Sequence, residues 1–238
     1  MIGMRIFSIC FLIVLLLPAC GAQTQSLSTK DVERELGVLR KALEAKQRDT
    51  TDVITDPNLM SLHLDPRFRE LIKEFAVVGR TRITPEGEPG EPLTISGVVI
   101  NGDGKALSGA LLNIYQTDVR GFYTPQHAMD EPHARLFAYI RTDSSGKFEF
   151  LTIRPGEYPQ TVRIDGQEQK IPGHIHVDVS APNHQPRKFQ LVFADEPLTQ
   201  TAYWQQWASR YGHPIITLKR DAGGRWTGAC SLVLSELK

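Results

Sequence analysis

The chain has 238 residues, and its 27 basic side chains balance its 27 acidic ones, so the formal net charge is zero. A neutral chain without a basic stripe lacks the electrostatic footprint of a nucleic-acid-binding protein. The length allows one large domain with its own hydrophobic core and a short additional segment.

Residues 1–19 are typical of a secretion signal. Arg5 precedes an apolar run at 6–17 that is shorter than the roughly 20 residues of a membrane-spanning helix. The run ends in Leu17-Pro18-Ala19-Cys20-Gly21, which resembles a bacterial lipobox, although a residue smaller than Pro18 is usual there. The resemblance implies a lipid on Cys20 and an exported, periplasm-facing lipoprotein, with the outer membrane slightly preferred; an ordinary exported protein is the alternative.

The three cysteines predict a chain without internal disulfides. Cys10 leaves with the signal and Cys20 carries the lipid, so Cys230 has no partner. Stability must then come from a packed core, and we interpret Cys230 as a small apolar residue inside it.

Residues 20–91 form a tether and a helical segment. Polar residues 21–28 are the spacer, and a first helix is predicted from Ser28 or Thr29, with apolar residues at helical spacing. A second helix is predicted from Asp65-Pro66 to Phe75, because a capping residue followed by proline is typical of a helix start. The first helix packs either on the main domain or on a second copy of the chain, so a homo-oligomer is one of two readings.

Residues 92–238 are predicted to form a mainly β domain, an antiparallel β-sandwich. A loop with prolines and glycines at 84–92 precedes it, and turn signals such as Asn101-Gly102-Asp103-Gly104 separate short alternating runs. The expected strands are 93–100, 110–118, 136–141, 147–153, a strand through His174 and 188–193, followed by a helical or irregular stretch at 202–211 and a last hairpin of 215–218 with 225–234.

The segment Pro172-Gly173-His174-Ile175-His176-Val177-Asp178-Val179 alternates in character. On a strand, successive side chains point to opposite faces, so His174 and His176 share one face and the aliphatic residues take the other. Two imidazoles held this way suit a metal ion, while two surface histidines on a wet sheet face are the alternative.

Four separated motifs resemble the intradiol ring-cleavage dioxygenases, the family of catechol and protocatechuate dioxygenases. They are Gly121-Phe122-Tyr123, Arg141-Thr142-Asp143-Ser144-Ser145-Gly146-Lys147-Phe148-Glu149-Phe150, Thr152-Ile153-Arg154-Pro155-Gly156-Glu157-Tyr158-Pro159 and His174-Ile175-His176. They occur in the family's order with similar gaps, and the resemblance covers roughly residues 92–195.

The resemblance implies a non-haem iron(III) held by Tyr123, Tyr158, His174 and His176. A trivalent metal stabilises phenolate, and hard anionic oxygen suits iron(III). The implied reaction opens a catechol-type ring between its two hydroxyl-bearing carbons with O2, with Tyr158 as general base and Gln190 near the substrate. The implied partners are a small aromatic diol, O2 and, through the lipid, a membrane.

Two positions depart from the family pattern. Ile171 stands where many members have an arginine, for which Arg163 or Lys170 could substitute, and Tyr139 stands where a basic residue is common, either as a packed strand residue or as a competing phenol. Two other functions therefore stay open: a non-catalytic binding module for an iron–catechol chelate or a carbohydrate, and a metal-free structural domain of the transthyretin-like kind.

Overall fold

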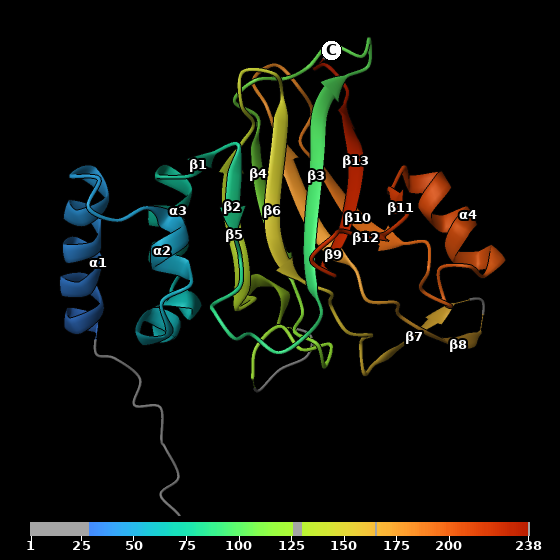
Figure 1. Cartoon of the computed structure of the whole chain (residues 1–238), viewed down its shortest axis with the longest axis horizontal. Helices are drawn as coiled ribbons and strands as arrows, with labels where there is room; N and C mark the ends of the chain where they lie inside the picture. Colours follow the sequence, from blue (N-terminus) through green and yellow to red (C-terminus); the bar gives the residue numbers. More distant parts are fainter. Residues whose placement is uncertain (1–28, 126–129, 165, 238) are drawn as a thin grey trace, which may run out of the picture.

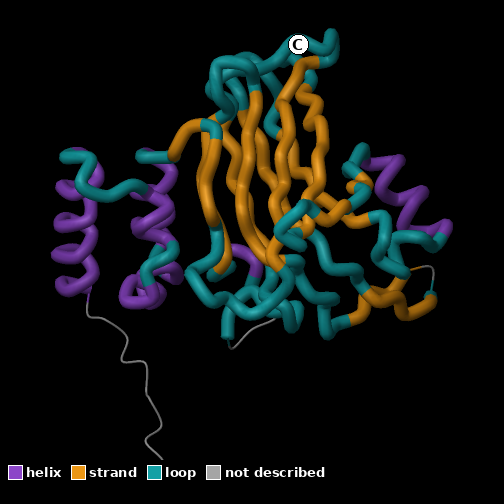
Figure 2. Tube along the Cα trace, in the orientation of Figure 1, coloured by secondary structure: helices purple, strands orange, loops and turns teal. Residues whose placement is uncertain are grey.

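The structure is a computed structural model that describes residues 29–125, 130–164 and 166–237 (Figures 1 and 2). The expected signal peptide, the lipidation site Cys20 and the spacer at 21–28 lie outside the described residues. Within the described ranges, no helix combines the length and apolar character needed to cross a membrane.

The helices of the N-terminal segment lie together on one flank of the molecule, beside β2 and β5 (Figure 1). They are α1 (Thr29–Glu44), α2 (Thr50–Ile54), the 3-10 helix η1 (Pro57–Leu64) and α3 (Pro66–Glu74). The prediction of a helix after Asp65-Pro66 is confirmed, since the Asp65 side chain accepts a hydrogen bond from the Arg67 amide. The short helices α2 and η1, capped by Asp49 and Asp56, lie between the two helices that the sequence predicts.

Six strands form the first sheet in the order β1-β5-β4-β9-β10-β11. Their bounds are Val77–Val78, Leu136–Arg141, Leu111–Gln116, Ile175–Ser180, Arg187–Phe193 and Ile215–Ile216. The four central strands pair antiparallel, while the short strands at both edges pair parallel to their neighbours. This sheet carries the histidine pair.

Five strands form the second sheet in the order β12-β13-β3-β6-β2. Their bounds are Lys219–Arg220, Trp226–Leu234, Pro92–Asn101, Lys147–Ile153 and Arg80–Arg82. The mainly β sandwich with N-terminal helices is thus confirmed, but its sheets are mixed, because β13 runs parallel to β3 and β2 runs parallel to β6. Strand pairing already begins at Val77 in the first sheet, before the expected loop at 84–92.

The C-terminal hairpin differs from our prediction. The short β11 joins β10 in the first sheet, so the partner of β13 in the hairpin is β12, closed by the turn at Asp221. The stretch after β10 contains α4 (Ala202–Tyr211), which Gly212 ends in a left-handed conformation. A small hairpin of β7 (Thr161–Ile164) and β8 (Gln167–Lys170) was not expected.

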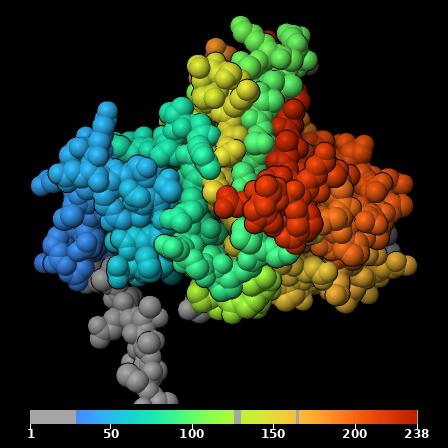
Figure 3. Space-filling view, in the orientation of Figure 1, coloured from blue at the N-terminus to red at the C-terminus, as the bar shows by residue number. Residues whose placement is uncertain are grey.

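The hydrophobic core lies between the two sheets. Ile175, Val177 and Val179 of β9 are at most 1% exposed and point into it, together with residues such as Ile95 and Phe150 of the second sheet. The outer face of β9 is therefore the face that carries His176. In the space-filling view the N-terminal helices and the α4 region form opposite flanks of the molecule, with strands of the second sheet between them (Figure 3).

Candidate active site

The two histidines share the outer face of the first sheet, as the alternation predicts. His176 lies on β9 between Tyr115 on β4 and Gln190 on β10, its direct partners in the strand register. His174 comes immediately before the strand and is 4% exposed. The Nε2 atoms of His174 and His176 are 2.9 Å apart.

Two glycines let the loops that carry Tyr123, Tyr158 and His174 pack backbone against backbone. Gly121 has a φ of +81°, and a Cβ there would overlap the carbonyl of Glu157. A Cβ at Gly173 would likewise overlap the carbonyl of Pro155. The Tyr158 amide also donates a hydrogen bond to the Ile171 carbonyl at 3.2 Å, which joins the loop of Tyr158 to the segment that leads to His174. The three loops thus converge because side chains are absent where they meet.

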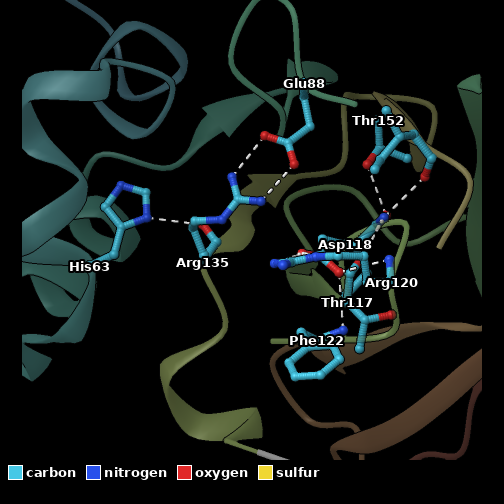
Figure 4. A network of polar contacts seen from close by, with 10 residues as sticks. His63, Glu88, Thr117, Asp118, Arg120, Phe122, Arg135 and Thr152 are labelled. Carbon is cyan, nitrogen blue, oxygen red and sulfur yellow. Dashed lines mark hydrogen bonds and ion pairs between the residues drawn. The ribbon is translucent and has the colours of Figure 1, made fainter. Parts of the chain in front are cut away.

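A polar network stabilises the loop that carries Tyr123 (Figure 4). The Asp118 carboxylate accepts hydrogen bonds from the amides of Arg120 and Phe122, at 2.9 and 3.1 Å. The amide of Arg135 donates to the Tyr123 carbonyl at 2.8 Å, and the Arg135 guanidinium makes a bidentate pair with Glu88 at 2.7 and 2.6 Å. A bidentate pair is geometrically specific, so it holds this loop against the sandwich.

The four candidate ligands present their donor atoms to one another. The hydroxyls of Tyr123 and Tyr158 are 2.6 Å apart, and the Tyr158 hydroxyl is 3.4 Å from Nε2 of His174. The Nδ1 of His174 lies 2.8 Å from the Pro172 carbonyl, which can only accept a hydrogen bond. The proton is therefore on Nδ1, and Nε2 keeps the lone pair that a metal ion requires.

Burial controls the charge of all four groups. Desolvation raises the pKa of Tyr123 and of Tyr158 above the ordinary value for a phenol. It also lowers the pKa of His174 to about 4 and that of His176 to about 2, the latter with a smaller contribution from the neighbouring His174. Without a cation, the cluster is two neutral phenols and two neutral imidazoles.

This donor set fits the iron(III) that the sequence resemblance implies. Two neutral imidazoles and two phenols converge from three loops and one strand. Among the described residues, no group of three or more His, Cys, Asp or Glu side chains could hold a metal ion, so the phenol oxygens are needed to complete a site. A hard trivalent ion would ionise the phenols and offset their charge.

The four side chains line a cavity of about 300 Å³. Its other walls come from Val162 of β7, from Ile171, from Glu131 in the 3-10 helix η2 (Glu131–His133), from Gln190 and from the aromatic side chains of α4. This volume is at the lower end of the roughly 300–1,000 Å³ range of small-ligand sites, which suits a compound with a single ring. A larger, open depression of about 1010 Å³ on the second sheet contains none of the candidate ligands.

Helix α4 supplies an aromatic wall, which we define as Tyr203, Trp204 and Trp207. The rings of Trp204 and Trp207 pack edge to face with centroids 5.2 Å apart. Trp207 also packs on His213 at 4.4 Å, and Nδ1 of His213 accepts a hydrogen bond from the Gln190 amide at 3.1 Å. The aromatic wall is thereby connected to β10 beside the histidine pair.

The first departure from the family pattern, Ile171, lies in the cavity. Ile171 is 9% exposed and lines the cavity. Arg163 and Lys170 are exposed and bond elsewhere, to the Gly166 carbonyl and to Glu157. Neither Arg163 nor Lys170 therefore supplies the positive charge that an arginine at position 171 would provide.

Tyr139 and Cys230 take structural positions. Tyr139 packs against Phe137 on β5 and lines a different cavity, so it is a packed strand residue, as one of our two readings had it. Cys230 is half-buried on β13, and burial raises the pKa of its thiol to about 12, which makes it unreactive.

Sequence reasoning missed Tyr115, Glu131 and the aromatic wall. The ring of Tyr115 stacks on His176 at 4.8 Å and 5°, and its hydroxyl donates to the Glu131 carboxylate at 2.6 Å. The only signal for Tyr115 was its place in a predicted strand, since the pairing of β4 with β9 cannot be read from composition. The aromatic spacing at 203–207 was visible, but nothing in it indicated which face of the domain the helix covers.

Comparisons with known proteins agree with this geometry. A family model described as "Dioxygenase" matches residues 66–211, more than half of the chain. A catechol 1,2-dioxygenase of Candida albicans is 32% identical over 44% of this chain and 37% of its own length. Catechol 1,2-dioxygenase 2 of Acinetobacter lwoffii is 31% identical over 60% of this chain and 54% of its own length. The chain thus spans about half the length of the curated relatives it matches.

Solved structures show the same fold. The catechol 1,2-dioxygenase of Acinetobacter sp. ADP1, with mercury bound, superposes with a TM-score of 0.54 over 89% of this chain and 80% of its own, at 21% identity. The 3-chlorocatechol 1,2-dioxygenase of Rhodococcus opacus 1CP gives the same TM-score over 89% and 90% of the two chains, at 16% identity. With the family model, the ordered motifs and the converging donors together, the chain belongs to the intradiol ring-cleavage dioxygenase family.

Proposed function

We propose that the protein is an iron(III) dioxygenase that opens a catechol-type ring between its two hydroxyl-bearing carbons. The observation that carries the proposal is the convergence of Tyr123, Tyr158, His174 and His176 on one cavity. The names of the relatives, which act on catechol, protocatechuate and hydroxyquinol, support the substrate class.

Bound iron(III) and the side chains around it would have different roles in the reaction. Bound iron(III) supplies Lewis acidity, which stabilises phenolate and diol oxygens as anions and activates the ring toward O2. The Tyr158 oxygen accepts a proton from one substrate hydroxyl. Tyr123, His174 and His176 stay as ligands. Gln190, beside His176 in the register, orients the ring. Both atoms of O2 enter the product, a cis,cis-muconate-type diacid.

Oxygen uptake by the iron-loaded protein tests the proposal. Catechol, protocatechuate and hydroxyquinol would be compared, with Tyr158→Phe as the variant. We expect uptake with at least one diol, and a loss of roughly 10²–10⁴-fold in Tyr158→Phe, the range for removal of a general base. Uptake that stays at the wild-type rate in Tyr158→Phe would remove Tyr158 from the mechanism.

A non-catalytic binding module is the second candidate, and Ile171 favours it. The position expected to carry a cation is apolar and buried, and neither Arg163 nor Lys170 replaces it. If catechols shift the visible spectrum of the iron-loaded protein without consuming oxygen, this alternative is correct. If the protein binds no iron, the metal-free structural domain is correct.

We further propose that Cys20 carries a lipid that tethers the protein to the bacterial outer membrane, facing the periplasm. The lipobox-like Leu17-Pro18-Ala19-Cys20-Gly21 supports this. Cys20→Ser should move the exported protein from the membrane fraction to the soluble fraction. Wild-type protein that is already soluble after export would contradict it.

A further inference from the structure

We infer that the cavity selects uncharged catechols and rejects ring-carboxylated ones, and that Glu131 and the aromatic wall of α4 set this preference. The inference deepens the proposed function and rests on it, because it assumes that an aromatic diol occupies the cavity at the donor cluster. It concerns the side chains of the cavity wall other than the four candidate metal ligands.

The first step is the charge on the cavity wall. Among the residues that the structure describes there, Glu131 is the one with a carboxylate, and none is a lysine or arginine. The basic side chains nearest in the sequence to Ile171 do not line the cavity, since Lys170 pairs with Glu157 at 3.3 Å and Arg163 bonds the Gly166 carbonyl. A carboxylate on the substrate ring would therefore enter without a counter-charge.

The second step is the position of Glu131. Its Oε1 accepts a hydrogen bond from the Tyr115 hydroxyl at 2.6 Å, and the Tyr115 ring stacks on the His176 imidazole. These contacts fix the carboxylate beside the candidate ligands. A second carboxylate in the same cavity would face a like charge in a medium that screens less than water, and it would lose its own hydration.

The third step is the aromatic wall. Trp204 is 7% exposed, and Tyr203, Trp204 and Trp207 form a continuous series of edge-to-face contacts at 5.2 Å. With Val162 and Ile171 they make the part of the cavity wall outside the donor cluster largely apolar. An apolar wall favours a hydrocarbon, halogen or plain ring edge over an ionised substituent.

Binding of catechol and protocatechuate to the iron-loaded full-length protein tests the inference. The dissociation constants come from the shift of the visible band, and for the metal-free protein from quenching of tryptophan fluorescence. We expect protocatechuate to bind at least about tenfold more weakly, which corresponds to ~1.4 kcal/mol. In Glu131→Gln this ratio should fall at least about threefold at unchanged iron content. The exposed Glu86→Gln is the matched control and should keep the wild-type ratio.

A second variant covers the case in which Glu131→Gln fails to fold, as judged by its thermal midpoint. Ile171→Arg places a cation on the cavity wall and should improve protocatechuate binding relative to catechol. Equal affinities in the wild type, or a ratio that neither variant changes, would overturn the inference. Absence of oxygen uptake with the preference intact would instead remove the dioxygenase proposal alone, so the two failures are distinguishable.

Discussion

The donor cluster and the aromatic wall line the same cavity, yet they are built differently. The cluster depends on backbone: glycines let three loops touch, and strand register places His176. The wall depends on side-chain packing within one helix, on the contact of Trp207 with His213 and on packing against the hydrophobic core. The difference indicates that the backbone of the sandwich fixes the donor cluster, whereas the aromatic wall depends on the identity of side chains in one helix.

Removal of a ligand should have the largest effect. His176→Ala deletes one of two imidazoles that no described residue replaces, so we expect iron affinity to fall by more than about 100-fold, beyond the 10- to 100-fold typical of a residue behind the ligands. The measurement is iron content by elemental analysis. His184→Ala, whose Nδ1 bonds the Pro182 carbonyl, should retain full iron content. Equal occupancy in both variants would reject the assignment.

A substitution at a glycine where the loops of the donor cluster touch should have the next largest effect. Gly121→Ala combines a left-handed conformation with an overlap against the Glu157 carbonyl, so it should lower the free energy of unfolding by about 2–4 kcal/mol. Gly102→Ala meets no atom within 4 Å and should change it by less than about 1 kcal/mol. Urea unfolding of the two variants gives the comparison. Similar losses in both would show that the loops do not depend on this contact.

Protonation of His63 should make the stability of the fold depend on pH. Its ring is packed between Phe68 and Phe137, and burial lowers its pKa from 6.5 to about 4. Because the folded pKa is depressed, the unfolded chain binds the proton first, and stability is lost as pH falls from 6.5 to about 4. The loss should reach about 3 kcal/mol. His63→Phe should remove this part of the slope in urea unfolding; an unchanged slope would contradict it.

A change in the aromatic wall should have the smallest effect, and it should alter the binding of catechol rather than the iron content. Trp207→Ala removes a cavity-lining ring, so we expect catechol to bind about tenfold more weakly at unchanged iron content. Trp226→Ala on the second sheet is the matched control, since its indole bonds Glu91 outside the cavity. Loss of iron in Trp207→Ala would show that wall and cluster are not independent.

Local signals in the sequence were sufficient for most of the long strands and for the shared face of the two histidines, whereas Tyr123 and Tyr158 were candidates only through the family resemblance. Alternation placed His174 and His176 on one face, and an Asp-Pro start placed α3. The parallel pairing of β13 with β3 and the stacking of Tyr115 on His176 depend on contacts between distant segments, which local patterns do not encode. The error in the last hairpin has the same origin, because β11 pairs with β10, from which α4 separates it in the sequence.

The visible spectrum of the purified protein after addition of iron(III) tests the central claim most directly, namely that two phenols and two imidazoles share one metal ion. We predict a red-brown charge-transfer band from tyrosinate to iron(III), weakened in both Tyr123→Phe and Tyr158→Phe and unchanged in Tyr139→Phe. Iron binding without that band, or a band that persists when both Tyr123 and Tyr158 are replaced, would contradict the assignment.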